Sequence, residues 1–465
     1  MRHSPGTMKP HFCLFLACAS LLAAQDKPKD PFVKNKPAAA ASPTTIPSAG
    51  EVVVSVKPAG AEVPKNVLCF IETFTLAQGD YAALLGGGHG HAKLYESMLA
   101  AVKAGTAKLD GCHMITCKSG MRSTLECVDE LIYPMEWTTA DRVGFQYPTA
   151  LEKHPLGDRF EFEPTLNTES GALEFTHVFS RDRFLGMRPV KADTTLPGVP
   201  VADVFEQRSP SSCHIIPGSP TLIATLNDAQ PENITLVFAT SEIISFKAPQ
   251  VPARKDTDSL LLTTRVISLD RMKGWELLKK HAADGAACLA ELKPLLAAKE
   301  AKLEHVSTIY TRSGIRADHI SGLLHTYGTE YAPPSGDIPA QPSTDPQKSG
   351  TPARSAGLAG TTLLETRSLG FHVEVEALLS EDNALVDMTL APEYVRMTGN
   401  LKDKNWNEHY PELPLFSKQQ IITGYTQVAD TTTLIGTLNP PGDTGANEHK
   451  DEARMWLLFM DVNLE

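Results

Sequence analysis

The sequence is poor in long hydrophobic runs, in basic charge and in aromatic residues. None of its apolar stretches approaches the roughly 18 residues that a membrane-spanning helix needs, which excludes a polytopic helical membrane protein. Its 43 Lys and Arg are outnumbered by 55 Asp and Glu, for a net charge of −12, and no basic segment stands out. Aromatic residues make up 7% and form no stacking platform, so the chain is not expected to bind nucleic acid.

Signatures of catalysis and of structural metal binding are also absent. There is no C-x-x-C, which argues against a zinc ribbon or a thioredoxin-like site, and no G-x-S-x-G nucleophile motif. The segment 86–91 reads Gly-Gly-Gly-His-Gly-His, and His89 and His91 are its candidate metal ligands. A metal site needs three or four converging ligands, so we favour a flexible loop at the start of a helix. The sequence therefore predicts no enzyme activity, no catalytic residue and no cofactor.

What is present begins with an export signal. Residues 1–24 read as a signal peptide, because a basic start precedes an apolar stretch and small residues precede the expected cleavage after Ala24. A membrane anchor and lipidation at Cys18 are the alternatives. Residues 25–50 are rich in Pro and Ala and are expected to form an extended linker. The chain is therefore expected in the periplasm or at the outer membrane.

Six cysteines remain after that cleavage. Loss of two basic residues leaves 41 Lys and Arg against 55 acids, so the mature net charge is −14. Because an exported chain meets an oxidising compartment, disulfides can form, and Cys117 and Cys127 could face each other across a hairpin. Buried free thiols fit the sequence equally well, so the pairing stays open. The six are Cys69, Cys112, Cys117, Cys127, Cys213 and Cys288.

The body of the chain repeats itself at a spacing of 194 residues. Residues 107–137 align without a gap onto 301–331. The positions that match within this alignment are 107–110 with 301–304, 118–122 with 312–316, Tyr133 with Tyr327 and Glu136 with Glu330. Several matches at one spacing predict a tandem duplication. We place the first repeat at 51–248 and the second at 258–465, with 331–360, rich in Pro, as a disordered insertion.

Both repeats are expected to follow one order of elements. An apolar strand at 67–71 or 260–266 is followed by a helical region, near 91–109 or 273–303, and Pro294 is expected to break the second. A hairpin with a Ser-Gly turn comes next, and long strands with alternating polar and apolar residues follow. The predicted class is α+β, with two tandem β-rich repeats that are each preceded by a helical region.

Several motifs of the second repeat occur in the order of one known protein family. The strongest single match is the segment 386–393, Val-Asp-Met-Thr-Leu-Ala-Pro-Glu. The other matching segments are the turn at Ser313 and Gly314, the strand that Gly370 leads, the turn at 381–383, Phe-Ser at 416–417, the strand that ends in Gly436, and the last strand at 456–459. In these features residues 305–465 resemble the C-terminal domain of the secretins of type II and type III secretion systems and of type IV pilus machines. Residues 110–245 resemble it more faintly.

The resemblance marks a set of structural motif residues and also has departures. The marked residues are Gly120, Tyr133, Gly314, Tyr327, Gly370, Asp387, Pro392, Glu393 and Gly436. Family members usually carry Asp-Gly-Gln-Thr where this chain has 429–433, and a Gly pair where Gly436 is followed by Thr437. The resemblance therefore implies two degenerate secretin-like copies.

The function implied by the resemblance is structural. We expect a secretin-like component of an outer-membrane assembly for protein secretion or pilus passage, which pairs through strand edges with copies of itself or with a larger secretin. The alternative is a soluble periplasmic accessory or binding module that keeps the fold and forms no pore. No residue of either prediction is catalytic.

Overall fold

The computed structural model describes residues 65–85, 90–139, 146–191, 198–228, 232–246, 258–333, 360–406, 410–447 and 453–465. All of them belong to one compact unit, 41–465. The expected signal peptide, the linker and Cys18 lie outside the described residues.

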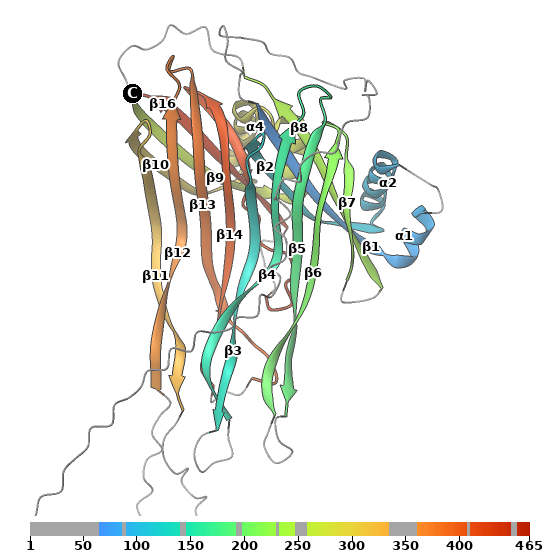
Figure 1. Cartoon of the computed structure of the whole chain (residues 1–465), viewed down its shortest axis with the longest axis vertical. Coiled ribbons are helices and arrows are strands. Elements are labelled where there is room, and N and C mark those ends of the chain that lie inside the picture. Colours follow the sequence, from blue (N-terminus) through green and yellow to red (C-terminus); the bar gives the residue numbers. More distant parts are fainter. Residues whose placement is uncertain are drawn as a thin grey trace, which may run out of the picture. The chain divides into compact units, whose positions relative to one another are not determined.

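The described part of the chain is built mainly of strands (Figure 1). In order, its elements are β1 (Asn66–Ala77), α1 (Gln78–Leu85), α2 (His91–Ala104), β2 (Ala107–Lys118), β3 (Ser123–Thr139), β4 (Gln146–Leu166), β5 (Leu173–Val190), β6 (Val199–Ile215), β7 (Thr221–Asn227), β8 (Asn233–Ile244), β9 (Ser259–Asp270), α3 (Arg271–His281), α4 (Gly285–Ala297), β10 (Lys302–Arg312), β11 (Arg316–Ala332), β12 (Gly360–Leu379), β13 (Leu385–Asn400), β14 (Pro414–Val428), β15 (Thr431–Thr437) and β16 (Arg454–Leu464).

The predicted α+β class is wrong. Strands hold 67% of the described residues and helices 13%, and the helices follow the first strand of each half instead of preceding a repeat. The predicted helical regions ran too far, because Leu109 already lies in β2 and Leu303 in β10. Pro294 lies inside α4 and does not break the region. The break comes at Asp284, whose side chain accepts a hydrogen bond from the Ala287 backbone N–H at 3.0 Å and caps α4.

The strands form two antiparallel sheets of eight. Sheet A has the order β10-β9-β16-β15-β2-β1-β8-β7, and sheet B has the order β11-β12-β13-β14-β3-β4-β5-β6. The residues up to β8 and those from β9 onward each give four strands to each sheet, in the same order. The element sequence β1 to β8, with its two helices, therefore matches β9 to β16 strand for strand.

The two Ser-Gly turns are corners between the sheets. We predicted hairpins there, but β2 and β3 lie in different sheets, as do β10 and β11. Gly120 and Gly314 both have positive φ, of 77° and 74°, which glycine adopts without strain. The Ser119 hydroxyl accepts a hydrogen bond from the backbone N–H of Leu166, and Ser313 accepts one from Leu379, both at 2.9 Å. A local Ser-Gly signal does not distinguish a corner from a hairpin.

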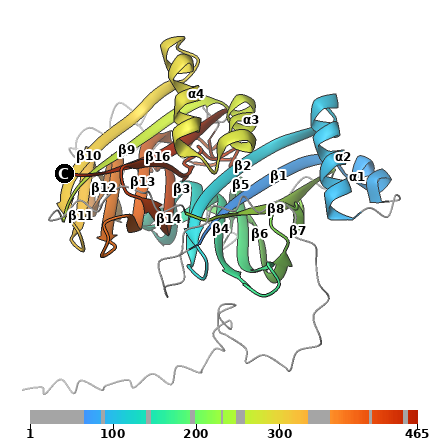
Figure 2. The same ribbon diagram turned by 90° about the horizontal axis from the view of Figure 1, so that it is seen from above.

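Two layers of core follow from this arrangement. One apolar cluster fills the space between the sheets, and its inward residues on β12 are Phe371, Val373 and Val375. The other lies between sheet A and the helices, which cover the side of sheet A away from sheet B (Figure 2). There Met98 of α2 and Leu278 of α3 are buried. Sheet A is therefore covered on both faces.

Sheet B is curled at one end. Besides its pairing with β12, β11 pairs with β4 through Glu330 and Ala150. The β4–β5 pairing stops at Gly157, whose φ is +117°, and beyond that point β4 leaves β5. A third apolar cluster, which includes Leu131 and Phe416, fills this end. The pairings thus link β11, β12, β13, β14, β3 and β4 in a closed series, in which β12 pairs with β13 only from Gly370 onward.

Candidate functional site: two sheet edges and a polar pocket

Each sheet has an edge strand at each of its two ends, β10 and β7 in sheet A and β11 and β6 in sheet B. Over most of its described length, each edge strand pairs with a neighbour on one side only. The four edge strands form two pairs, each with one strand from either sheet. The first pair, β10 and β11, belongs to the second half of the chain, and we call it the β10–β11 edge. The second pair, β7 and β6, belongs to the first half and forms the β6–β7 edge. Unpaired backbone N–H and C=O groups at a sheet edge favour the addition of another strand. Both sheets therefore offer two sites of the kind that mediates β-sheet assembly.

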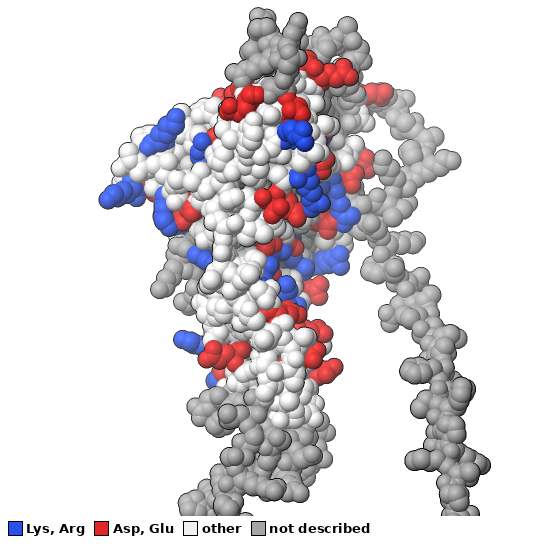
Figure 3. Space-filling model, turned by 90° about the vertical axis from the view of Figure 1, so that its left-hand side faces the viewer, with Lys and Arg blue, Asp and Glu red and all other residues white. Residues whose placement is uncertain are grey.

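The β10–β11 edge is unusually apolar for an exposed surface. Figure 3 faces this side and shows broad uncharged areas interrupted by mixed acidic and basic groups. Its exposed large apolar residues are Leu303, Val306, Tyr310, Ile315, Ile320, Leu323 and Leu324. Exposed apolar surface of this kind marks interaction sites.

The equivalent residues of β2, found with the spacing of 194, are buried. Leu303 is 46% exposed and its equivalent Leu109 is 6% exposed. Tyr310 is 66% exposed and its equivalent Thr116 is fully buried. The difference arises because β2 and β3 are covered by the second half of the chain. Among the described residues, no strand lies on the outer side of β10, and β11 has only the contact of Glu330 with Ala150 of β4 on that side. The β10–β11 edge is therefore exposed, although the equivalent strands of the first half, β2 and β3, are covered within the chain.

The cover over β2 and β3 is the internal junction, which we define as the contacts of β15 with β2 and of β14 with β3. In sheet A, Gly436 lies opposite Ile115. In sheet B, Leu415 to Ile422 pair with Leu131 to Thr124. Side chains reinforce both strand pairs. The Thr116 hydroxyl donates to the Leu434 carbonyl at 3.0 Å, and the Lys418 ammonium donates to Glu126 at 2.6 Å.

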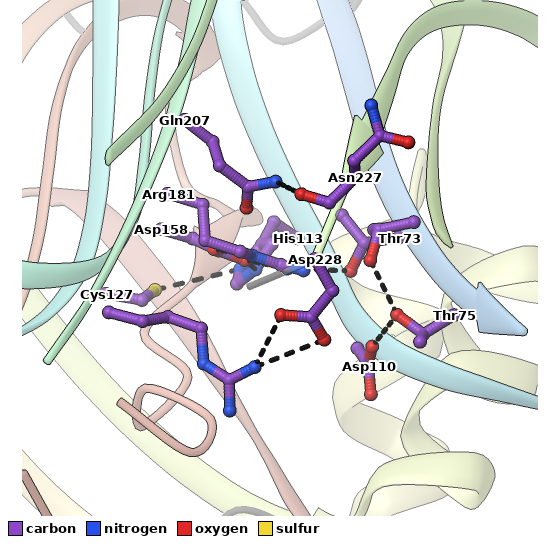
Figure 4. Close-up of polar contacts among 12 residues, drawn as sticks. Thr73, Thr75, Asp110, His113, Cys127, Asp158, Arg181, Gln207, Asn227 and Asp228 are labelled. Carbon is purple, nitrogen blue, oxygen red and sulfur yellow. Dashed lines mark hydrogen bonds and ion pairs between the residues drawn. The ribbon is translucent and has the colours of Figure 1, made fainter. Parts of the chain in front are cut away.

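A polar pocket opens between the sheets, in the first half of the chain. Its volume is about 320 Å³, and residues of both sheets and of the segment 439–444 line it. The charged lining residues are Lys108, Arg181, Arg183, Arg271, Asp110, Asp158, Asp182, Asp228 and Asp443. These charges are largely paired within the protein. The Arg183 guanidinium donates to Asp228 and Asp443 at 3.0 Å. Figure 4 shows Asp228, Asp158 and Arg181 among the polar contacts of the pocket.

Arg181 and Asp158 form an ion pair within the pocket. The guanidinium donates two hydrogen bonds to the carboxylate, at 2.6 and 2.8 Å, and both side chains are largely buried. Burial alone would raise the pKa of Asp158, but the charge and hydrogen bonds of Arg181 outweigh it and hold that pKa below the usual range. The pair also joins the sheets, because Arg181 donates to the Thr73 hydroxyl of β1 at 3.4 Å.

A thiol, an imidazole and a carboxylate also meet in this pocket. The Cys127 Sγ lies 3.7 Å from Nδ1 of His113, and Nε2 of His113 lies 3.8 Å from Asp158. This resembles the residue set of a cysteine nucleophile, but burial raises the pKa of the Cys127 thiol well above its ordinary value, with the Asp158 charge adding to the rise. Both carboxylate oxygens of Asp158 already accept hydrogen bonds from Arg181, so this carboxylate is not dedicated to orienting the imidazole of His113. The geometry suits water or a small polar molecule and not a thiolate nucleophile.

The described part of the second half has aromatic residues where the first half has the ion pair of this pocket. In the first half, the residue after Gly157 is Asp158, which lies opposite Arg181 on the neighbouring strand. In the second half, the residue after Gly370 is Phe371, which lies opposite Tyr394. The two glycines match closely in backbone, with φ of +117° and +118°. Period-two alternation could have revealed the buried charges, because Asp158 shares the parity of the apolar residues that follow it on β4.

The motif residues marked by the family resemblance lie at several separate places. Gly120 and Gly314 form the corners, and Gly370 kinks β12. Gly436 allows β15 to approach β2 closely, because a Cβ at this position would lie 2.6 Å from the Met114 carbonyl oxygen. The remaining motif residues are placed as follows: Tyr133 is half-buried at the curled end, the ring centroid of Tyr327 lies 5.3 Å from that of Phe416, Asp387 pairs with Lys118, Pro392 lies opposite Val373, and Glu393 accepts from Arg367 at 3.1 Å.

The candidate metal ligands and the cysteines are placed only in part. His89 lies outside the described residues, and Nδ1 of His91, at the start of α2, accepts a hydrogen bond from the Leu222 backbone N–H at 2.9 Å. Among the described residues, no group of three or more His, Cys, Asp or Glu is placed to hold a metal ion. Cys117 and Cys127 lie in different sheets, and all six described cysteines are free thiols.

Comparisons with known proteins give weak similarities. No family model and no curated protein matches the chain. The V. cholerae type IV competence pilus secretin PilQ shares 8% identity at a TM-score of 0.21, over 88% of this chain and 62% of that one. A chain of the ETEC pilotin–secretin AspS–GspD complex shares 6% identity at a TM-score of 0.20, over 87% of this chain and 50% of that one. This chain thus spans about half to three fifths of their lengths. None of the described helices is both long and apolar enough to cross a membrane.

Proposed function

We propose that this protein is an exported, non-enzymatic, secretin-like structural component of an outer-membrane assembly, of the type II or type III secretion or type IV pilus kind, and that its copies join through their sheet edges. One observation carries the proposal: the internal junction already joins two matching half-molecules through both sheets. The motif resemblance of residues 305–465 to secretins supports the class of assembly.

The strand order gives the contact between copies. β15 and β14 of the second half match β7 and β6 of the first, and β2 and β3 match β10 and β11. A second copy that repeats the internal junction would therefore set its β6–β7 edge against the β10–β11 edge of the first. Such a contact is head to tail, so it leaves one edge of each kind free and builds a ring where the rotation between copies closes. The apolar residues of the β10–β11 edge would be covered in it, as their equivalents on β2 are covered within the chain.

A second candidate is the soluble periplasmic accessory module. The observation that favours it is the pairing of Glu330 with Ala150, which turns the end of β11 onto β4 of the same chain. A chain that closes one of its own edges is suited to remain monomeric. The two candidates differ in oligomeric state and in membrane association.

The decisive experiment measures the native mass and membrane partition of the signal-processed protein from its own envelope. A detergent-extracted ring of many subunits is the expected result. The test variant is Tyr310→Lys, which puts a charge at the centre of the β10–β11 edge, and the control is Met272→Lys on α3, also exposed but away from both edges.

The expected outcome is that Tyr310→Lys remains monomeric while Met272→Lys assembles like the wild type. A wild-type protein that stays a soluble monomer at all concentrations contradicts assembly and favours the accessory module. Assembly that is equally sensitive to both substitutions, or to neither, contradicts the proposed edge.

A further inference from the structure

At the curled end, Arg367 of β12 contacts a residue three strands away in the sheet order. Its Nε and Nη2 donate to the two carboxylate oxygens of Glu130 on β3, at 2.9 and 3.0 Å. Its Nη1 donates to Glu393 on β13 at 3.1 Å. Because β13 and β14 lie between β12 and β3, this contact requires the curl and cannot form in a flat sheet.

The contact is largely buried and has the features of a strong ion pair. The side chain of Arg367 is 20% exposed and that of Glu130 is 5% exposed. The Lys153 ammonium of β4 also donates to Glu130, at 3.4 Å. Bidentate guanidinium–carboxylate pairs are among the strongest and most directional side-chain contacts. The pair therefore holds β12 against β3 and draws β4 into the same cluster.

Because of the curl, the end of β11 contacts other strands of the same chain. Tyr327 lies with its ring centroid 5.3 Å from that of Phe416 on β14, and Glu330 pairs with Ala150 of β4. The remaining length of the strand is exposed, as at Leu323 and Leu324. A strand added to β11 would therefore meet β4 before it reached the end of β11.

We propose that the Arg367–Glu130 pair is an autoinhibitory clamp: it keeps sheet B closed on itself in the single chain, and its release frees β11 for the β6 strand of a second copy. The inference rests on the proposed assembly through sheet edges. With the spacing of 194, the β3 residues 124–131 that pair with β14 correspond to β11 residues 318–325. The incoming strand would run along these residues toward Tyr327, which is partly buried against Phe416 of the same chain.

Two variants test the clamp in opposite directions, both in the full signal-processed chain. Glu330→Cys with Ala150→Cys locks the curl, because these residues lie directly opposite each other at a separation that a disulfide can span. The matched control is Thr326→Cys with Thr366→Cys, which links β11 to β12, its partner with or without the curl. Arg367→Met opens the clamp and keeps most of the side-chain volume.

The readouts are native mass and hydrogen exchange of the β11 amides in the monomer. We expect the oxidised lock to block assembly, its reduction to restore assembly, and the oxidised control to assemble normally. We expect Arg367→Met to speed β11 amide exchange about tenfold and to assemble faster than the wild type.

The outcomes separate the clamp from the proposed function. A locked chain that assembles like its reduced form overturns the clamp and leaves edge assembly standing. Unchanged β11 exchange in Arg367→Met also overturns it. If every variant, locked or open, stays monomeric, edge assembly itself fails and the inhibitory role falls with it.

Discussion

Glu72 and Lys279 form an ion pair between the two halves of the chain, in which the carboxylate is buried and the lysine side chain is 32% exposed. The Lys279 ammonium of α3 donates to the fully buried carboxylate of Glu72 on β1 at 3.0 Å, and it lies 5.0 Å from the ring centroid of Phe70. Tyr95 and Trp275 also donate to this carboxylate, at 2.8 and 2.5 Å. A helix of the second half is thereby fixed to a central strand of the first.

We predict that Lys279→Met lowers the free energy of unfolding by about 3 kcal/mol, because it leaves a buried carboxylate with neutral donors only. The matched control is Lys280→Met, which removes the neighbouring ammonium from an exposed pair with Glu291 and should cost less than about 1 kcal/mol. Urea unfolding measures both. Equal losses in the two variants would mean that the Glu72–Lys279 pair stabilises the fold no more than an exposed pair does.

The Asp158–Arg181 pair predicts a loss of stability in acid. The pKa of Asp158 is lower in the folded chain than in the unfolded chain, so the unfolded chain takes up its proton first as pH falls. The stability that this pair contributes is complete above the ordinary carboxyl pKa of about 4 and is lost progressively below it.

Asp158→Asn should flatten this part of the curve of unfolding free energy against pH. The comparison variant is Asp203→Asn, whose partner Arg188 is exposed. We expect Asp203→Asn to keep the wild-type pH dependence. A wild-type curve retained by Asp158→Asn would place the acid sensitivity at other carboxylates.

Much of the strand content could be predicted from the sequence, because alternation is a local signal. On β12 the apolar residues Phe371, Val373 and Val375 alternate with polar ones and are buried, and the expected turn at 381–383 lies between β12 and β13. These predictions needed only the period of two and the turn residues.

The division of strands between two sheets could not be predicted in the same way. Whether Gly120 makes a hairpin or a corner depends on which strand lies beside β2, and that strand, β15, is more than 300 residues further along the chain. The α+β prediction failed for a related reason. Apolar residues at helical spacing near Leu109 and Leu303 do not reveal where a helix gives way to a strand.

The pocket and the clamp were also beyond local reasoning, since their members come from different strands. Asp158 and Arg181 are 23 residues apart, and Arg367 and Glu130 are 237 apart. Alternation could have indicated that Asp158 and Arg181 are buried, but not that they face each other. Partner identity depends on strand order, which a single sequence does not reveal.

The kink at Gly370 predicts a large effect for a small substitution. A Cβ at this position would lie 2.3 Å from the Ser321 carbonyl oxygen, and the φ of +118° is one that residues with a side chain rarely adopt. We expect Gly370→Ala to lower the free energy of unfolding by about 3 kcal/mol or more. Gly171→Ala is the control, because its φ is also positive but its Cβ would meet no atom within 4 Å, so it should cost about 1 kcal/mol. Denaturant unfolding of both variants separates the steric clash from the backbone preference.

The cysteines predict a low thiol reactivity in the folded protein. Five of the six described thiols are buried, and only Cys213 is partly exposed. Burial raises the pKa of Cys288 to about 12 and raises that of Cys112 further, so neither forms a thiolate at neutral pH. We therefore expect a charged thiol reagent to label at most Cys213 in the folded chain and all six cysteines after unfolding. Fewer than six thiols after unfolding without reductant would reveal a disulfide and contradict the free-thiol arrangement.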